Sequence, residues 1–147
     1  MSAARRVFTP AMNPGSIAGP SRDTYKFMGR EAIYRLIEDF YRELEASSIR
    51  SMFPQDMHES SQRSAAFFVQ LLGGPADYNE QYGNPRMRAR HLPFRITEAA
   101  RQVWLGCFER VLEGAEHRYA FPPEHLQGFR AFLDGFSRWM VNTEEES

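Results

Sequence analysis

The stretch that decides the fold of this chain is Arg86-Met87-Arg88-Ala89-Arg90-His91-Leu92-Pro93-Phe94-Arg95-Ile96. It predicts a short helix over residues 85–92, which ends there because the residue before a proline disfavours the helical conformation. His91 therefore lies in the last turn of that helix. A neutral imidazole is a common metal ligand, but a lone histidine is also a common exposed helix residue. The sequence on either side must decide between the two.

Composition and charge limit the classes of protein to consider. The chain has 147 residues, which predicts one domain. Aromatic residues make up 14% and include twelve phenylalanines, which indicates either a phenylalanine-rich core or a pocket for a flat, apolar ligand. A formal net charge of −1 gives no reason to expect a nucleic-acid or membrane-surface partner. No stretch approaches the roughly 20 apolar residues that span a bilayer.

The single cysteine, Cys107, excludes an intramolecular disulfide and suits a reducing compartment. It lies one helical turn from Trp104 on an apolar face, so a buried structural thiol is a better interpretation than a nucleophile. Arg5 and Arg6 are not followed by an apolar segment, so no secretory signal is expected. These observations predict a cytoplasmic protein.

Three regions are expected along the chain. Residues 1–20 carry several prolines and glycines with little hydrophobic periodicity, which indicates a flexible N-terminal extension. Residues 21–142 are expected to form the folded domain. Residues 143–147 are polar and acidic, and we expect a disordered tail there.

Helical spacing dominates the central region. Apolar residues over 33–44 recur at i, i+3, i+4 and i+7, and no segment alternates as a half-buried strand would. Asp56 with Glu59 predicts an N-cap with its reciprocal carboxylate, and Gly73-Gly74-Pro75 predicts the end of the helix that follows. Thr97 can cap a third long helix. Pro122-Pro123-Glu124 can open the fourth.

Shorter segments join these helices. Residues 76–85 are polar and contain glycine, so they are expected to be mostly loop, and residues 114–121 are expected to be a connection. The predicted fold class is therefore all-α, with four long helices and short elements between them.

Catalytic and metal-binding motifs are scarce. The chain has no His-Glu-x-x-His, no Cys-x-x-Cys, no Gly-x-Ser-x-Gly and no phosphate-binding loop. Its four histidines are not spaced as a zinc site, and one cysteine cannot complete one. His91 is the candidate that remains.

A haem iron needs a nitrogen ligand on one side and a shaped pocket on the other. The ligating ring also needs an acceptor for its second nitrogen. A histidine at a helix end before a proline suits both needs. Met87 lies one turn earlier, and Phe94 and Ile96 follow where they could contact a porphyrin edge. Arg63 and Arg90 could pair with its propionates.

The wider pattern is specific. It comprises Gly73-Gly74-Pro75, Tyr78, Gly83, Pro85, the stretch over residues 86–96, Trp104, Cys107, Phe40-Tyr41 and Met140-Val141-Asn142. Over roughly residues 25–142, this pattern resembles the truncated haemoglobins of group II. The resemblance implies a shortened globin, a two-over-two sandwich of helices around haem b.

The resemblance also implies roles for individual residues. His91 matches the proximal ligand of the iron. Tyr41 and Trp104 match the distal residues whose O–H and N–H donate to a bound ligand, although on residue type alone either could be a plain core residue. The other expected cofactor-binding residues are Phe53, Ser60, Arg63, Ser64, Phe67, Phe68, Tyr78, Met87, Arg90, Phe94 and Ile96.

Within that set, Phe53 matches an aromatic position on the haem face or is a core residue, and Phe67 and Phe68 would line the inner pocket. Ser60 or Ser61 would lie nearest the ligand, and Ser64 or Ala65 next inward. We prefer Ser60 and Ser64, because that register keeps Arg63 in place.

Two interpretations of function follow. The first is a haem-binding globin that binds dioxygen or another diatomic ligand. Two strong distal donors predict slow release, which favours redox chemistry such as nitric-oxide dioxygenation or peroxide reduction, or sensing, over bulk transport. An unidentified reductant would then be a partner, and base rates allow a homodimer. The second is a cofactor-free helical interaction module, which the same amphipathic helices would suit.

Overall fold

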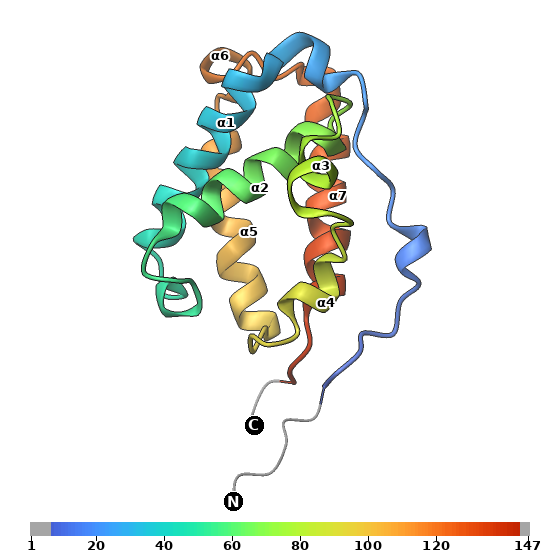
Figure 1. Ribbon diagram of the computed structural model, residues 1–147, viewed down its shortest axis with the longest axis vertical. Helices are drawn as coiled ribbons and strands as arrows, with labels where there is room; N and C mark the ends of the chain where they lie inside the picture. Colours follow the sequence, from blue (N-terminus) through green and yellow to red (C-terminus); the bar gives the residue numbers. More distant parts are fainter. Residues whose placement is uncertain (1–6, 145–147) are drawn as a thin grey trace, which may run out of the picture.

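A computed structural model describes residues 7–144, and its ordered elements are all helical (Figure 1). No strand occurs within these residues, which confirms the predicted all-α class. The elements in chain order are η1 (Pro14–Ser16), α1 (Thr24–Glu45), η2 (Arg50–Met52), α2 (Met57–Leu71), α3 (Asp77–Tyr82), α4 (Met87–His91), α5 (Glu98–Leu112), α6 (Ala115–Arg118) and α7 (Pro123–Met140).

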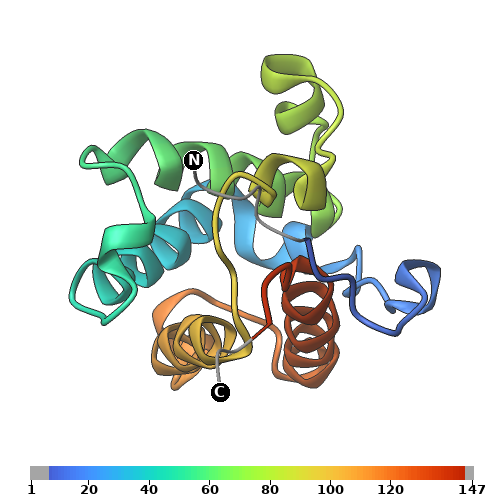
Figure 2. The same cartoon turned by 90° about the horizontal axis from the view of Figure 1, so that it is seen from below.

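The four long helices form two layers. Figure 2 looks along α5 and α7, which lie side by side, with α1 and α2 in the opposite layer. One phenylalanine from each helix meets at the centre. Phe108 of α5 stacks on Phe40 of α1 with ring centroids 3.8 Å apart, and lies 5.6 Å from Phe68 of α2 and 5.9 Å from Phe129 of α7. This arrangement is the two-over-two sandwich that the sequence predicted.

The predicted helix starts are mostly confirmed. The side chain of Thr97 accepts a hydrogen bond from the Ala100 N–H at 3.1 Å, and that of Asp56 accepts from the His58 N–H at 3.0 Å. The Glu59 carboxylate, expected to complete the cap at Asp56, instead accepts a hydrogen bond from Arg63 at 3.1 Å, one turn along the helix. A cation at i+4 competes here for the carboxylate.

The glycine pair ends α2 as predicted. Gly73 has φ +102°, its N–H donates to the Gln70 carbonyl, and the Gly74 N–H donates to the Val69 carbonyl. This is the 6→1 and 5→2 pattern of a Schellman motif. The pair also brings two helices together, because a Cβ on Gly73 would lie only 1.8 Å from the carbonyl oxygen of Arg22, just before α1.

One loop prediction was wrong, because residues 76–85 contain α3. Residues 114–121 form the expected connection between α5 and α7, and the short helix α6 lies within it. Neither helix has a side-chain N-cap, so local sequence gave little sign of them. Tertiary contacts stabilise α3 instead: its Tyr78 is 0% exposed, and the Gln70 side chain of α2 bonds both the backbone N–H and the side chain of Asn79.

The two ends of the described chain meet beside α4. The backbone N–H of Phe8 donates to the carbonyl of Asn142 at 2.8 Å, and the Thr143 N–H donates to the Ile96 carbonyl at 3.1 Å. Residues 1–6 of the expected flexible extension and residues 145–147 of the expected tail lie outside the described part. The proposed bounds of 21–142 for the folded domain stay a prediction. No helix within residues 7–144 is long and apolar enough to cross a membrane.

A tyrosine–aspartate pair joins α6 to α1. The Tyr119 hydroxyl donates to Asp39 Oδ2 at 2.5 Å. Burial and this carboxylate together raise the pKa of Tyr119 from 10.0 to about 12. The folded protein therefore prefers the neutral phenol more strongly than the unfolded chain does.

The first prediction compares two glycines that both have positive φ. Gly83 has φ +80° and ψ −163°, which only glycine adopts readily, and open space around a Cβ, so Gly83→Ala should cost about 2 kcal/mol of unfolding free energy. Gly73→Ala meets the Arg22 carbonyl as well and should cost about 3 kcal/mol or more. Urea denaturation of both variants beside the parent protein measures the difference. Equal costs would show that the close approach of α1 does not constrain Gly73.

The second prediction concerns alkaline pH. A raised folded-state pKa gives stability that is complete below the unfolded pKa of 10.0 and is lost as pH rises through about 12. The difference in unfolding free energy between the parent protein and Tyr119→Phe should therefore decrease as pH rises from 10.0 to about 12. Denaturant titrations over this range measure it, and a difference independent of pH would contradict the assignment.

Candidate functional site

His91 is the last residue of α4, and its ring is fixed by its own helix. The Nδ1 atom lies 2.6 Å from the carbonyl oxygen of Met87. A carbonyl can only accept, so Nδ1 carries the proton and Nε2 is left with a lone pair. Burial lowers the pKa of His91, and the bond to Met87 acts in the opposite direction. The neutral imidazole with a fixed second nitrogen is the form that ligates a metal.

Arg88 fixes the position of α4 from its other side. Its Nη1 donates to the carbonyls of Trp139 and, at 2.8 Å, Val141, while its Nη2 donates to the Phe8 carbonyl at 2.8 Å. The guanidinium also lies 4.7 Å from the centre of the Trp139 ring. Burial lowers the pKa of Arg88.

Asn142 closes the turn that follows His91. It is 0% exposed, its Nδ2 donates to the His91 carbonyl at 3.2 Å, and its Oδ1 accepts from the Ile96 N–H at 3.0 Å. Sequence reasoning assigned no role to Arg88 or Asn142. Their partners are carbonyls and an N–H about fifty residues away in sequence, and no local pattern reveals such partners.

Tyr41 and Trp104 both contact Phe40. Both rings meet Phe40 edge-on, at 5.6 Å and 5.5 Å, and Phe53 contacts Tyr41 at 6.1 Å. Burial raises the pKa of Tyr41, while a hydrogen bond with Ser64 and the charge of Arg63 act in the opposite direction. Within residues 7–144 the indole N–H of Trp104 has no protein acceptor. Two donors from α1 and α5 thus lie in one aromatic group.

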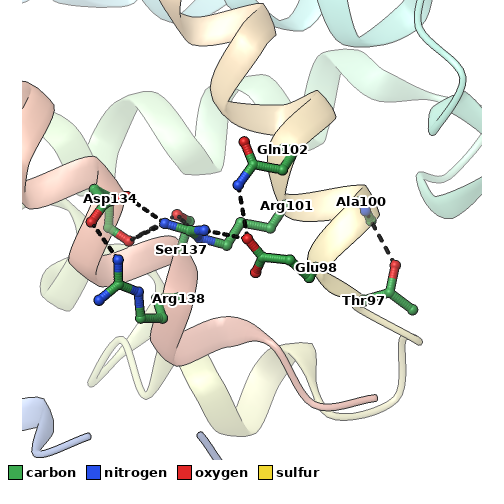
Figure 3. A network of polar contacts seen from close by, with 8 residues as sticks. All are labelled: Thr97, Glu98, Ala100, Arg101, Gln102, Asp134, Ser137 and Arg138. Carbon is green, nitrogen blue, oxygen red and sulfur yellow. Dashed lines mark hydrogen bonds and ion pairs between the residues drawn. The ribbon is translucent and has the colours of Figure 1, made fainter. Parts of the chain in front are cut away.

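The start of α5, one turn before Trp104, is joined to α7 by a buried arginine (Figure 3). Arg101 is 5% exposed and donates to Glu98 at 2.6 Å, to Ser137 Oγ at 3.0 Å and to Asp134. A buried charge is costly unless it is paired and hydrogen-bonded, and Arg101 is paired here with carboxylates from both helices. The network therefore fixes the helix that carries Trp104.

The predicted phenylalanine pair divides between two environments. Phe68 lies in the core with Phe108 and Phe129. Phe67 is half-buried and contacts Tyr78 of α3 at 5.9 Å and Phe136 of α7 at 5.8 Å. Only Phe67 of the two faces the side on which α3 lies.

Two arginines contact the aromatic rings of α3. Arg63 of α2 lies 5.1 Å from the Tyr82 ring, and Arg90 of α4 lies 5.7 Å from the Tyr78 ring. Arg90 also donates to the carbonyls of Pro85 at 2.8 Å and Tyr82 at 2.9 Å, so part of its donor capacity is already used.

The remaining predicted positions are only partly buried or are exposed. Met87, Ile96 and Ser60 are half-buried, and Phe94 is 42% exposed, with its ring 6.5 Å from that of His91. Ser64 acts on the pKa of Tyr41, whereas Ala65 is fully buried in the core, and the choice of Ser60 and Ser64 stays a prediction.

Several polar atoms of this region have no partner. The hydroxyl of Tyr78 and the Nε of Arg63 are buried, and neither forms a hydrogen bond within residues 7–144. Buried polar groups are normally bonded, so such atoms call for an explanation. With the free Nε2 of His91 and the exposed Phe94 ring, they fit a flat, apolar macrocycle that carries acidic groups. No group of three His, Cys, Asp or Glu that could bind a metal ion by itself occurs in this part of the chain.

Comparisons with known proteins agree with this fit. The family described as bacterial-like globin matches residues 24–134. Group 2 truncated hemoglobin YjbI of Bacillus subtilis is 36% identical over 127 residues, which cover 82% of this chain and 89% of that protein.

Solved structures give the same result. Phosphate-bound Hell's gate globin IV has a TM-score of 0.83 and 31% identity, covering 99% of this chain and 88% of that one. A truncated oxygen-avid haemoglobin from Bacillus subtilis has a TM-score of 0.74 and 32% identity, covering 81% and 98%. A cofactor-free interaction module is not favoured, and the chain is a haem-binding globin that belongs to the group II truncated haemoglobins.

Proposed function

We propose that Nε2 of His91 is the axial protein ligand of the haem iron. The observation that carries this proposal is the 2.6 Å contact between Nδ1 and the Met87 carbonyl, which fixes both the tautomer and the ring. Burial favours the neutral ring as well, by lowering the pKa of His91. The free nitrogen is therefore available without the loss of a proton.

The residues around His91 would hold the rest of the haem. Met87, Phe94 and Ile96 would contact the side that His91 binds, and Phe67 and Phe53 the inner and opposite parts. Arg63, Arg90 and the unpartnered Tyr78 hydroxyl gather around α3 and would bond the propionates. A buried donor with no protein partner supports this placement, because a propionate oxygen would satisfy it.

Tyr41 and Trp104 would donate hydrogen bonds to a diatomic ligand on the distal side. The haem supplies an iron that binds dioxygen and exchanges electrons when it is bound to the protein. Ser64, which acts on the pKa of Tyr41, would orient its hydroxyl, and Ser60 would lie nearest the ligand. Donors fixed in advance in an aromatic surrounding stabilise a partly negative ligand strongly, because few waters compete.

This arrangement favours retention of the ligand. We therefore propose redox chemistry on it, such as nitric-oxide dioxygenation or peroxide reduction, or sensing, in preference to bulk oxygen transport. The relative from Bacillus subtilis is described as oxygen-avid, which supports slow release. Redox turnover consumes electrons, so a reductant is a required partner. Nitrate formation on rapid mixing of the oxygenated protein with nitric oxide tests dioxygenation, and its absence would exclude that reaction.

The third prediction tests the distal donors. A hydrogen bond contributes about 1.5 kcal/mol, so Tyr41→Phe and Trp104→Phe should each speed dioxygen release by about tenfold. Stopped-flow release rates measure the change. Tyr34→Phe, on the same helix but with a half-buried side chain beside Asp77, is the matched control and should release dioxygen at the parent rate. Unchanged rates in both distal variants would refute the donor roles.

The fourth prediction tests the axial ligand. His91→Gly should lose the optical spectrum of a histidine-ligated haem, and added imidazole should restore it, because the free base can enter the space that the side chain leaves. His117→Ala removes an exposed histidine and should leave the spectrum unchanged. A normal spectrum for His91→Gly without imidazole would mean that another residue binds the iron.

A further inference from the structure

The backbone of Phe8 is bonded through both of its polar groups. Its N–H donates to the Asn142 carbonyl at 2.8 Å, and its carbonyl accepts from Arg88 Nη2 at 2.8 Å. Phe8 belongs to an N-terminal segment, residues 7–13, that runs along the outer side of α7 (Figures 1 and 2). The segment is thus hydrogen-bonded to two residues, Asn142 and Arg88, that are far from it in sequence.

The two partners of Phe8 are the two residues that fix the surroundings of His91. Arg88 lies in α4, three residues before His91, and joins that helix to the end of α7. Asn142 bonds the His91 carbonyl and the Ile96 N–H. One residue of the N-terminal segment therefore contacts both polar supports of the proximal helix.

Phe8 carries the hydrogen bonds that join residues 7–13 to α4 and to the chain just after α7. Val7 is 47% exposed, and Phe8, Pro10 and Ala11 line an open pocket of about 490 Å³ together with residues of α5 and α7. The segment can therefore leave the surface without opening the aromatic core. Its departure would remove one acceptor from a partly buried guanidinium, and an ionised donor that loses its partner is unfavourable.

We propose that the N-terminal segment is a positioning element for His91, acting through Arg88 and Asn142. With Phe8 in place, Arg88 donates to three carbonyls and α4 has one orientation against α7. Without it, α4 gains freedom, and the His91 ring with it. This inference rests on the proposal that His91 is the axial ligand.

Deletion of residues 2–10 tests the inference in the haem-loaded protein. Haem transfer to an excess of a haem-scavenging apoprotein should become faster on the order of tenfold, as the loss of a bond to a charged group predicts. The iron–histidine stretching band of the reduced protein in resonance Raman spectra should shift or broaden, which a general loss of stability would not cause. Helix content measured by circular dichroism should change only slightly.

Two point variants separate the backbone bond from the side chain. Phe8→Pro removes the N–H that Asn142 accepts and should act in the direction of the deletion. Phe8→Ala keeps both backbone bonds and should match the parent protein. A parent-like haem transfer rate and Raman band in both the deletion and Phe8→Pro would overturn the inference. If instead His91→Gly kept a histidine-ligated spectrum, the axial-ligand proposal itself would fail.

Discussion

Phe108 of α5 contacts one phenylalanine from each of the other three long helices, and the rest of the structure depends on this junction. Aromatic side chains bury large apolar areas and prefer defined ring geometries, so they fix helix positions as well as stabilise them. Three aromatic residues of the candidate site lie next to members of the junction in sequence. Tyr41 is the next residue after Phe40, Phe67 is the residue before Phe68, and Trp104 lies one turn before Phe108. The core therefore positions the two proposed distal donors directly.

The proximal side depends on polar contacts instead. The short helix α4 has no fully buried residue, so apolar packing fixes it weakly. Arg88 compensates by bonding backbone groups near the two ends of the described chain, and Asn142 by bonding the His91 carbonyl and the Ile96 N–H that follow α4. Such bonds are directional and, where buried, costly to break. The proposed distal residues are thus positioned by core packing, whereas α4 is positioned by a few hydrogen bonds, and one of these comes from the N-terminal segment.

Local signals in the sequence predicted most of the fold. Capping by Asp56 and Thr97, the glycine stop at Gly73 and the apolar stripe of α1 each involve neighbours within a few residues, so periodicity and residue type were sufficient. The helix α3 was missed because its stability comes from Tyr78 and from the Gln70 side chain, not from a cap. The same limit applies to the site. The sequence indicated His91, Tyr41 and Trp104, but not the supports at Arg88 and Asn142.

The sequence by itself determined the helical class, the helix ends and which residue types could serve a haem, because these depend on spacing along one chain segment. The tertiary structure decided which of them act together. It brought Tyr41 and Trp104 together against Phe40, fixed the free nitrogen of His91, left the Tyr78 hydroxyl without a partner in the described chain and brought Phe8 to α4. Those relations join residues far apart in sequence, and only the packing of α1, α2, α5 and α7 sets the distances between them.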